Sequence, residues 1–505
     1  MGFREAIERI PGWGRWVLGV TALRAVIAAV VPLTPEEAYH WNFAVHLDWS
    51  YFDHPPMIAW AIALGRFAFG DVPFGIRFVP LLFSAGTASL LAGAAGRWYG
   101  EKAAVWTVIL LSVQPITLLA SGAGFPDSPL LFFWTAALLT AWRAIESGRP
   151  LWWVASGAAL GASMLSKYTA AFLGLSVFIY LVFSTRHRRA LVTPWPYVAC
   201  LVAAGVFAPV LFWNASHDWV SFRYQSLNRF EQADEINPIA AVKFLGQQWL
   251  GVLPLTLPLA IASLKKLFRY EKSHERFLLS AFLPMLAFFF LLGWTRSIHL
   301  MWPLPAYLSL TILMAGEVAR GDCASARFFE RRRRWLVGGA AVALVFAAVH
   351  TAYFLPFLSP LRGLYGWKEV AAEAQRVRME LPEGSFVLGL GRKYTCPSQI
   401  AFQLRKPHEV HGKNLLGLLG LQYDFWADPA ILRGRDAVVV LEGGDRVANL
   451  MELLRKHFRS VEPAGEVVVP IGRRCLLKQP PLRFALFRAR DYQPPAGPRP
   501  AAAWP

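Results

Sequence analysis

The chain has 505 residues, of which 55% are hydrophobic, 14% aromatic and 17% charged, and its mean hydropathy is +0.37. A soluble protein of this length carries more charge and fewer long apolar runs, so the composition excludes an ordinary soluble enzyme and indicates a polytopic membrane protein. The net charge of +18 does not indicate nucleic-acid binding, because much of the excess lies in short loops where the positive-inside rule accounts for it.

The first apolar segment, at about 16–33, has no small-residue cleavage site after it, which predicts an uncleaved first helix and not a signal peptide. About eleven crossings are expected in all. The other segments lie at about 72–96, 103–121, 128–145, 151–166, 169–184, 193–213, 246–264, 277–294, 300–318 and 335–355. When the N-terminus is placed inside, Lys and Arg collect in the inside loops, most densely at Arg331, Arg332, Arg333 and Arg334. This bias predicts an N-in, C-out topology.

The stretch 33–60 follows the first segment and is expected to lie at the membrane surface without crossing it. It mixes acids and histidines with aromatic rings: Glu36, Glu37, Asp48, Asp53, His40, His46, His54, Tyr39, Trp41, Trp49, Tyr51, Phe52 and Trp60. Ionisable groups can act on a polar head carried by a lipid, while Trp and Tyr favour the water–lipid boundary. The alternative is an interfacial loop with solvated acids and aromatic anchors. The other polar clusters, at 122–128, 166–168, 214–245 and 294–302, fall on the same predicted outer side, which favours the functional interpretation.

Two motifs in this stretch carry candidate site residues. In the pair Glu36–Glu37, one carboxylate is suited to act as a general base on an acceptor hydroxyl, and the other to bind sugar hydroxyls or cap a helix. In Asp53-His54-Pro55-Pro56 the prolines stiffen the backbone and open a helix. A helix N-terminus beside a cationic His suits an anionic phosphate, although a turn with a capping Asp is the simpler interpretation.

Further candidates lie in later outer turns. Asp127, at the start of the fourth helix, is either a site residue or an N-cap. Lys167 is a lone cation on the outer side, which a phosphate partner would explain and snorkelling would also explain. Arg296 and His299 are weaker candidates of the same type. The histidines His40, His46 and His54 form at most a weak metal-binding group, so no cofactor is assigned and a divalent cation stays open.

The loop at 214–245 is amphipathic and is expected to form a surface helix or a lid, with a structural role and a gating role equally open. Beyond residue 355 the pattern changes. Helices are expected at 366–381 and 448–458, strands at 385–390, 436–443, 466–471 and 483–489, and a short apolar run at 398–404. This predicts a small extracytoplasmic α/β domain at 356–492, after a transmembrane domain at 1–355 whose first outer loop (33–66) is catalytic. A disordered tail is expected at 493–505. Cys396 and Cys475 could pair on the outer side.

With these motifs in hand, the chain resembles the polyprenyl-phosphate-sugar-dependent membrane glycosyltransferases of the glycosyltransferase-C superfold. The likeness is greatest to the bacterial relatives of protein O-mannosyltransferases and to the lipid A aminoarabinose transferase. The matching motifs are Pro35-Glu36-Glu37-Ala38-Tyr39-His40-Trp41, Tyr51-Phe52-Asp53-His54-Pro55-Pro56, Pro126-Asp127-Ser128-Pro129, Ser166-Lys167-Tyr168-Thr169, Trp302-Pro303-Leu304-Pro305-Ala306-Tyr307 and Gln422-Tyr423-Asp424-Phe425-Trp426.

The resemblance implies a fold of about eleven membrane helices and places an essential carboxylate in the acidic pair. In the family the first member of this pair is usually Asp, and here it is Glu36. A Lys precedes the paired prolines in the aminoarabinose transferases, and here His54 holds that place, so that Lys167 and His54 are expected to share the lipid phosphate. Tyr39 and Tyr168 lie inside matching motifs and are predicted to bind substrate.

The expected function is an inverting glycosyltransferase at the outer face of a bacterial inner membrane. It would move a monosaccharide from a polyprenyl-phosphate donor to a lipid, glycan or protein acceptor. A transporter or flippase for a lipid-linked solute is an alternative, which predicts ionisable residues along the middle of several helices and repeat symmetry. A non-catalytic scaffold is another, which predicts indifference to the loss of Glu36 or Asp127. The sequence does not name the sugar, the acceptor or the oligomeric state.

Overall fold

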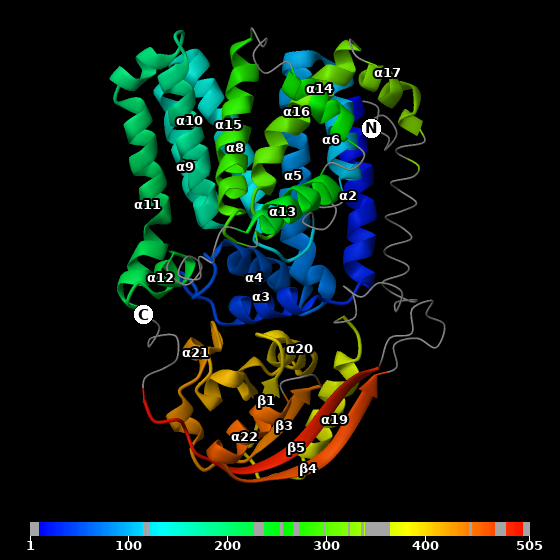
Figure 1. The fold of residues 1–505 in the computed structure, drawn as a ribbon, viewed down its shortest axis with the longest axis vertical. Coiled ribbons are helices and arrows are strands. Elements are labelled where there is room, and N and C mark those ends of the chain that lie inside the picture. Colours follow the sequence, from blue (N-terminus) through cyan, green and yellow to red (C-terminus); the bar gives the residue numbers. More distant parts are fainter. Residues whose placement is uncertain are drawn as a thin grey trace.

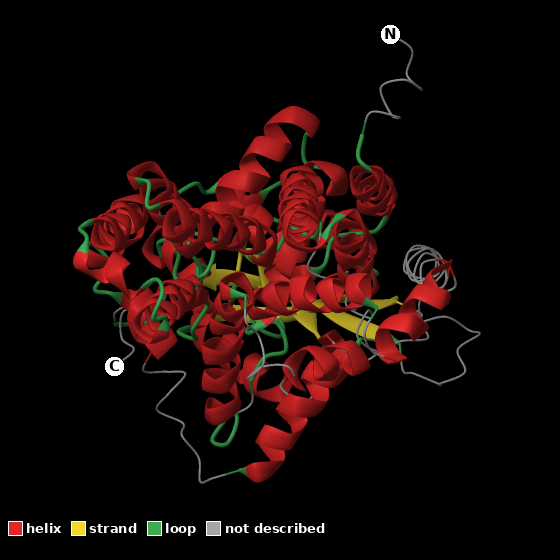
Figure 2. Ribbon diagram, turned by 90° about the horizontal axis from the view of Figure 1, so that it is seen from above, coloured by secondary structure: helices red, strands yellow, loops and turns green. Residues whose placement is uncertain are grey.

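A computed structural model describes residues 10–114, 117, 122–226, 237–252, 256–265, 272–296, 298–321, 324–334, 338, 364–443, 447–469 and 481–497. A bundle of helices forms one end of the molecule and a twisted sheet with its own helices forms the other (Figure 1). We call these the helical part and the α/β part. Seen along the bundle, the strands lie beneath the helices (Figure 2).

The helical part contains the long apolar helices. Its elements are α2 (Gly12–Val30), α5 (Pro73–Tyr99), α6 (Glu101–Val113), α8 (Asp127–Ser147), α9 (Pro150–Met164), α10 (Ala171–Phe183), α11 (Trp195–Ala215), α13 (Pro238–Val252), α14 (Leu257–Lys265), α15 (Ser273–Leu292), α16 (Leu304–Arg320) and α17 (Ala324–Arg331). Within the described ranges, α2, α5, α8, α11 and α15 are the five helices long and apolar enough to cross a membrane. The chain is therefore a multi-pass membrane protein.

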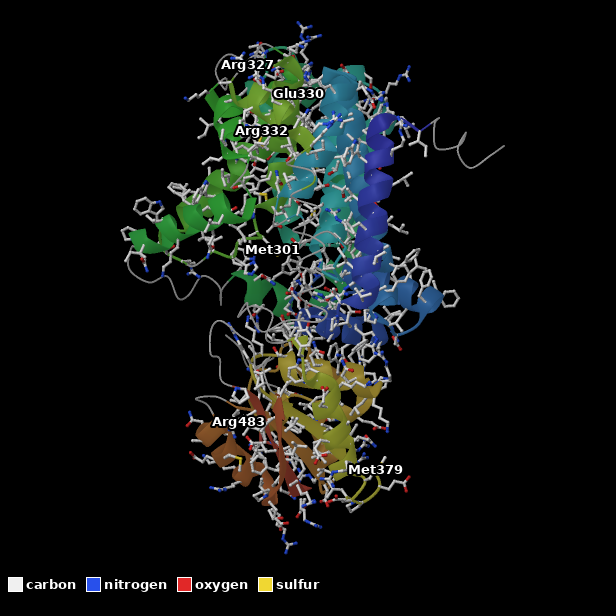
Figure 3. The ribbon with its side chains drawn as sticks, turned by 90° about the vertical axis from the view of Figure 1, so that its right-hand side faces the viewer. Met301, Arg327, Glu330, Arg332, Met379 and Arg483 are labelled. Carbon is white, nitrogen blue, oxygen red and sulfur yellow. The ribbon has the colours of Figure 1, made fainter. Side chains whose placement is uncertain are left out.

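Each apolar segment predicted between 16 and 318 contains helix within the described ranges, but α6 ends at Val113, inside the segment predicted at 103–121, and the segment at 246–264 is also not one helix. The segment at 246–264 is shared between α13 and α14, and α13 lies across the direction of its neighbours (Figure 3). Pro258 lies in the first turn of α14, where its missing N–H is not needed. The last predicted segment, 335–355, lies almost wholly outside the described residues.

Two short helices from the stretch 33–66 lie between the bundle and the α/β part: α3 (Pro35–Val45) and α4 (Met57–Phe69) (Figure 1). Helix α3 begins with a capping box, in which Thr34 and Glu37 exchange hydrogen bonds between side chain and backbone. This cap fixes where the acidic pair enters the helix. The stretch thus lies at the end of the bundle, as the sequence predicted.

The α/β part is built on a five-stranded sheet of order β2-β1-β3-β5-β4. Its strands are β1 (Phe386–Leu390), β2 (Val410–His411), β3 (Ala437–Glu442), β4 (Phe458–Val469) and β5 (Leu482–Tyr492). Its helices are α19 (Trp367–Arg378), α20 (Thr395–Leu404), α21 (Tyr423–Trp426) and α22 (Val447–His457). β1 is parallel to β2 and β3, while β5 is antiparallel to β3 and β4. The predicted helices and strands are present, the apolar run 398–404 is part of α20, and β2 was not predicted.

The central strands are buried on both faces, as the continuous apolar runs in β1 and β3 require. Val387 and Val438 pack with α19 and α20 in one cluster, and Leu388 and Val439 pack in another on the opposite face. The first of these clusters also contains residues of α3 and α4: Ala38, Trp41, Ala44, Ile58 and Ile62. The α/β part and the stretch 33–66 therefore share one apolar core.

Candidate active site

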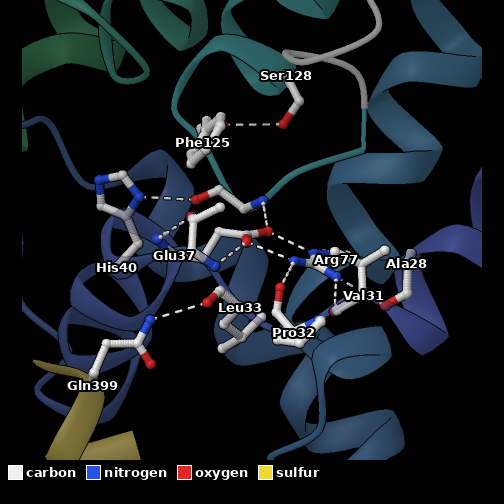
Figure 4. Close-up of polar contacts among 12 residues, drawn as sticks. Ala28, Val31, Pro32, Leu33, Glu37, His40, Arg77, Phe125, Ser128 and Gln399 are labelled. Atoms are coloured by element: carbon white, nitrogen blue, oxygen red, sulfur yellow. Dashed lines mark hydrogen bonds and ion pairs between the residues drawn. The ribbon is translucent and has the colours of Figure 1, made fainter. Parts of the chain in front are cut away.

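The structural anchor of the site is an ion pair between Glu37 of α3 and Arg77 of α5. Arg77 Nε lies 2.6 Å from Glu37 Oε1 and Nη2 lies 2.6 Å from Oε2 (Figure 4). Glu37 also accepts hydrogen bonds from the backbone N–H groups of Thr34 and Gly124, each at 2.9 Å. Both side chains are buried. Burial opposes ionisation of Glu37, but Arg77 and the two N–H groups outweigh it and hold the pKa of this carboxyl below its usual value.

The remaining N–H groups of Arg77 bind backbone carbonyls at the end of the first membrane helix. They donate to the carbonyls of Ala28, Val31 and Pro32 at 3.1, 2.6 and 2.9 Å. The Glu37–Arg77 pair therefore joins α2, α3, α5 and the turn at Gly124. Arg77 was not among the site residues predicted from the sequence. It is a lone cation near the end of an apolar segment, which is the same feature that identified Lys167.

The neighbouring residue, Glu36, has the opposite environment. It is half-buried and lines a cavity of about 380 Å³, and no described residue donates a hydrogen bond to its carboxylate. The lining residues are Thr34, Pro35, Glu36, Phe125, Arg392, Lys393, Tyr394 and Thr395. Because consecutive helical residues point about 100° apart, anchoring Glu37 leaves Glu36 directed elsewhere.

The pKa of the Glu36 carboxyl is raised to about 7. Burial is the largest cause, and the negative charges of Asp127, Glu37 and Asp53 act in the same direction, whereas Lys167 opposes them. A carboxylate with this pKa is a much stronger base than an exposed glutamate and is still substantially ionised near neutral pH.

Asp127 and Lys167 form an ion pair beside Glu36. Lys167 Nζ lies 2.9 Å from Asp127 Oδ1, and both side chains are largely buried. Asp127 is the first residue of α8 but makes no capping hydrogen bond, so the N-cap alternative from the sequence is wrong. Lys167 is held by a carboxylate within the protein, which a snorkelling side chain would not be.

Tyr39, Asp53, His54 and His40 lie next to this group. Tyr39 donates from its hydroxyl to Asp53 Oδ1 at 3.2 Å, and His54 Nε2 lies 4.0 Å from Asp53 Oδ2. The His40 and His54 rings are in edge contact, with centroids 5.4 Å apart. Burial lowers the pKa of His40 to about 4, so the ring is neutral and its Nδ1–H donates to the carbonyl of Gly124 at 2.8 Å.

The α/β part holds this cluster from the other side. The Tyr394 ring stacks on Tyr39 with centroids 3.9 Å apart and planes inclined by 2°. The backbone N–H of Gln422 donates to the Tyr39 hydroxyl at 3.0 Å, and its side-chain oxygen accepts from the N–H of Phe52 at 2.6 Å. Gln399 donates to the carbonyl of Leu33 at 2.9 Å (Figure 4). Gln422 begins a motif that the sequence had singled out, whereas Tyr394 and Gln399 gave no signal.

Three predicted site residues do not line the cavity beside Glu36, although one of them, Tyr168, interacts electrostatically with Asp53. Tyr168 packs against Phe207 and Phe222, with centroids 6.2 and 5.4 Å away. Arg296 and His299 lie between α15 and α16 and do not line the cavity beside Glu36.

The suggested grouping of His40, His46 and His54 is wrong. His46 is turned to the α/β part, where its Nε2 lies 3.0 Å from His408 Nδ1 and its ring stacks on Trp426. In the part of the chain that the structure describes, no three His, Cys, Asp or Glu residues are arranged to hold a metal ion. Cys396 is buried, and its suggested partner Cys475 lies outside the described residues.

The predicted lid at 214–245 is described only in part. Helix α12 (Val220–Ser226) packs beside the site, where Ser221 donates to the carbonyl of Tyr51 at 3.0 Å and Gln225 to that of Asp53 at 2.8 Å. The segment 227–236 lies outside the described ranges.

Comparison with known proteins places this geometry in context. Residues 53–213 match the family described as dolichyl-phosphate-mannose-protein mannosyltransferase. In structure, the chain is similar to ArnT from Cupriavidus metallidurans in the apo state, with a TM-score of 0.66 and 16% identity over 94% of this chain and 97% of that one. The chain therefore has the fold of ArnT. ArnT bound to undecaprenyl phosphate is a second structural match, with a TM-score of 0.64 and 16% identity over 94% of this chain and 98% of that one.

Sequence relatives of this chain include two transferases. The chain is 27% identical over 304 residues to the lipid A galacturonosyltransferase RgtD of Rhizobium johnstonii, which covers 59% of this chain and 63% of that protein. It is 28% identical over 346 residues to the undecaprenyl phosphate-alpha-4-amino-4-deoxy-L-arabinose arabinosyl transferase 2 of Pseudomonas fluorescens. This match covers 60% of this chain and 56% of that protein. The matches thus span less than two thirds of these relatives' length. The family resemblance predicted from the sequence motifs is confirmed.

Proposed function

We propose that the chain is an inverting glycosyltransferase that moves a monosaccharide from a polyprenyl-phosphate donor to an acceptor hydroxyl. The observation that carries this proposal is Glu36, a carboxylate with a pKa of about 7 and no hydrogen-bond donor among the described residues, which opens into a cavity beside the Asp127–Lys167 pair. The relatives' names mention lipid A and undecaprenyl phosphate, which favours a lipid acceptor over a glycan or a protein.

The proposed reaction is a single displacement. The acceptor oxygen attacks the anomeric carbon of the donor while Glu36 takes the hydroxyl proton, and the bond from that carbon to the phosphate oxygen breaks with both electrons leaving on the phosphate. Polyprenyl phosphate is a good leaving group, so stabilising its charge matters more than protonating it. We assign that stabilisation to Lys167 and His54.

The remaining predicted residues take supporting roles in this proposal. Glu37 is a positioning residue, because Arg77, Gly124 and Thr34 already occupy its oxygens. Asp53 and Tyr39 are placed to bind sugar hydroxyls at the same cluster. Three residues remain predictions only: Tyr168, Arg296 and His299. They do not line the cavity beside Glu36.

We further propose about eleven crossings, with the N-terminus in the cytoplasm and the α/β part outside the bacterial inner membrane. The exposed Arg327 and Arg332 lie at the end of the bundle farthest from the α/β part (Figure 3). Basic residues favour the cytoplasmic side, so the site and the α/β part fall on the opposite side. The division at 1–355, 356–492 and 493–505 belongs to this proposal.

Membranes carrying the full chain test the proposal when they are given radiolabelled undecaprenyl phosphate linked to galacturonic acid, 4-amino-4-deoxyarabinose or mannose, with lipid A as acceptor. We expect the wild type to transfer label from one of these donors. Lys167→Met should reduce transfer about 10- to 100-fold, because it removes a charge-assisted contact to the leaving phosphate. If labelled donor crosses the membrane without transfer of its sugar, the transporter alternative is favoured. If the donor is neither moved nor used, the scaffold alternative is favoured.

The pH dependence of transfer should follow Glu36. The proposed base must be ionised, so kcat/KM should rise tenfold per pH unit below about 7 and level off above it, because the pKa of Glu36 is raised to about 7. Asp127→Asn should move this rise to lower pH, because it removes a negative charge that raises the pKa and frees Lys167 to lower it. A profile already flat at pH 5 would contradict the assignment of Glu36 as the base.

A further inference from the structure

The cavity beside Glu36 has walls from both parts of the chain. Thr34, Pro35 and Phe125 line it from the helical part, and the turn 392–395 between β1 and α20 lines it from the α/β part. A substrate group that reaches Glu36 through this cavity therefore contacts the α/β part as well. The role of this part has no explanation in the transfer reaction as described so far.

The turn 392–395 presents two cations without partners in the described ranges. Arg392 and Lys393 are both exposed, and neither side chain takes part in an ion pair with a described carboxylate. Several other basic residues of the α/β part are paired: Arg376 with Glu373 and Glu380, Arg378 and Lys406 with Glu409, Arg483 with Glu466, and Arg488 with Glu380. Lys368 and Arg459 are exposed and form no ion pair with a described carboxylate. Unlike Lys368 and Arg459, the unpaired cations Arg392 and Lys393 line the cavity beside Glu36.

The backbone of this turn is fixed in an unfavourable conformation. Lys393 has φ 50°, in the left-handed region that side chains with a Cβ rarely adopt. The next residue, Tyr394, is held by its stack on Tyr39, which lies in the same helix as Glu36. Strained backbone that persists in this way concentrates at binding and catalytic sites. The stack fixes the two cations relative to the proposed base.

The position of the cations points to the acceptor as their ligand. Lys167 and His54, which we assign to the donor phosphate, both belong to the helical part and its adjoining stretch 33–66. The opposite wall of the cavity is left for the molecule that supplies the hydroxyl to Glu36. We propose that Arg392 and Lys393 bind an anionic group on the acceptor, such as a phosphate ester, and so make the α/β part a determinant of acceptor specificity. This inference rests on the proposed function of the same site.

A binding experiment tests the inference without turnover. The full chain in lipid nanodiscs is titrated with fluorescent lipid A carrying its phosphates, and with the same lipid after enzymatic dephosphorylation. We expect Arg392→Gln/Lys393→Gln to weaken binding of the phosphorylated lipid about 10- to 100-fold, and to change binding of the dephosphorylated lipid little. The matched control is Lys368→Gln/Arg459→Gln, which removes the same charge from exposed positions that do not line the cavity.

A kinetic experiment separates the two substrates. In the transfer assay the double variant should raise KM for the phosphorylated acceptor and leave KM for the donor unchanged. A rise in donor KM alone, or weaker binding of undecaprenyl phosphate with normal binding of lipid A, would assign the cations to the donor phosphate and overturn the inference. Competition by free inorganic phosphate at millimolar concentration, with no preference for phosphorylated lipid A, would also overturn it.

The outcomes distinguish this inference from the proposed function. If the wild type transfers label and the double variant keeps wild-type affinity for the phosphorylated lipid, the inference is wrong and the enzyme assignment stands. If no donor supports transfer but the double variant loses affinity for the phosphorylated lipid, the α/β part still recognises an anionic lipid and the catalytic proposal fails alone.

Discussion

Replacing Glu36 by Gln should reduce sugar transfer by about 10²- to 10⁴-fold, the usual contribution of a general base. Gln keeps the length and most of the volume of Glu but accepts no proton. Since no described residue hydrogen-bonds to the Glu36 carboxylate, the change breaks no described contact. The measurement is kcat for label transfer in membranes with matched expression, together with the thermal unfolding midpoint, which should not fall.

Glu36→Asp is the matched variant for this prediction. This variant keeps the negative charge but shortens the side chain by one methylene. We therefore expect partial transfer activity that still depends on pH as in the wild type. If Gln and Asp variants both retained full activity, Glu36 would not be the base, and Asp127 would be the next carboxylate to test.

The second large effect is on stability. Arg77→Leu should lower the free energy of unfolding by about 3–5 kcal/mol, because it leaves Glu37 buried without its counter-charge and removes donors from the carbonyls of Ala28, Val31 and Pro32. The measurement is resistance of the detergent-solubilised chain to heat or denaturant. Transfer activity should fall as well, since Glu37 fixes the start of α3 and hence the direction of Glu36.

Two further variants separate charge burial from a general defect in α5. Glu37→Leu/Arg77→Leu removes both charges and should recover part of the lost stability, because replacing a whole buried pair costs less than breaking it. Arg97→Met changes an exposed Arg at the other end of the same helix and should be nearly neutral. A double variant as unstable as Arg77→Leu alone would show that the carbonyl contacts, and not the ion pair, carry the effect.

Much of this arrangement was predictable from the sequence, for identifiable reasons. Apolar runs mark helices strongly, and turns rich in Asp, Lys and Pro on one predicted side identified Asp127 and Lys167 separately. Their direct ion pair was not predictable, because a distance between residues 40 positions apart depends on how α8 and α9 pack. For the same reason the sequence did not separate Glu36 from Glu37, since the difference between them comes from Arg77 and Gly124.

The contribution of the α/β part was the least predictable. No sequence motif around Tyr394 and Gln399 indicates a functional site. They reach the site only because α20 packs on α3 through a shared apolar core. His46 was misassigned for a related reason, because its partner His408 lies 362 residues along the chain. Local pattern gives little information about such contacts.

The bond between Tyr39 and Gln422 joins residues 383 positions apart, and this separation has a consequence for biogenesis. The first outer stretch leaves the ribosome long before the segment that completes it. During synthesis its apolar face has no partner from the α/β part, and closing so long a loop comes late in folding. Under the proposed function, competence for transfer therefore arises only after Gln422 has been synthesised and has reached Tyr39.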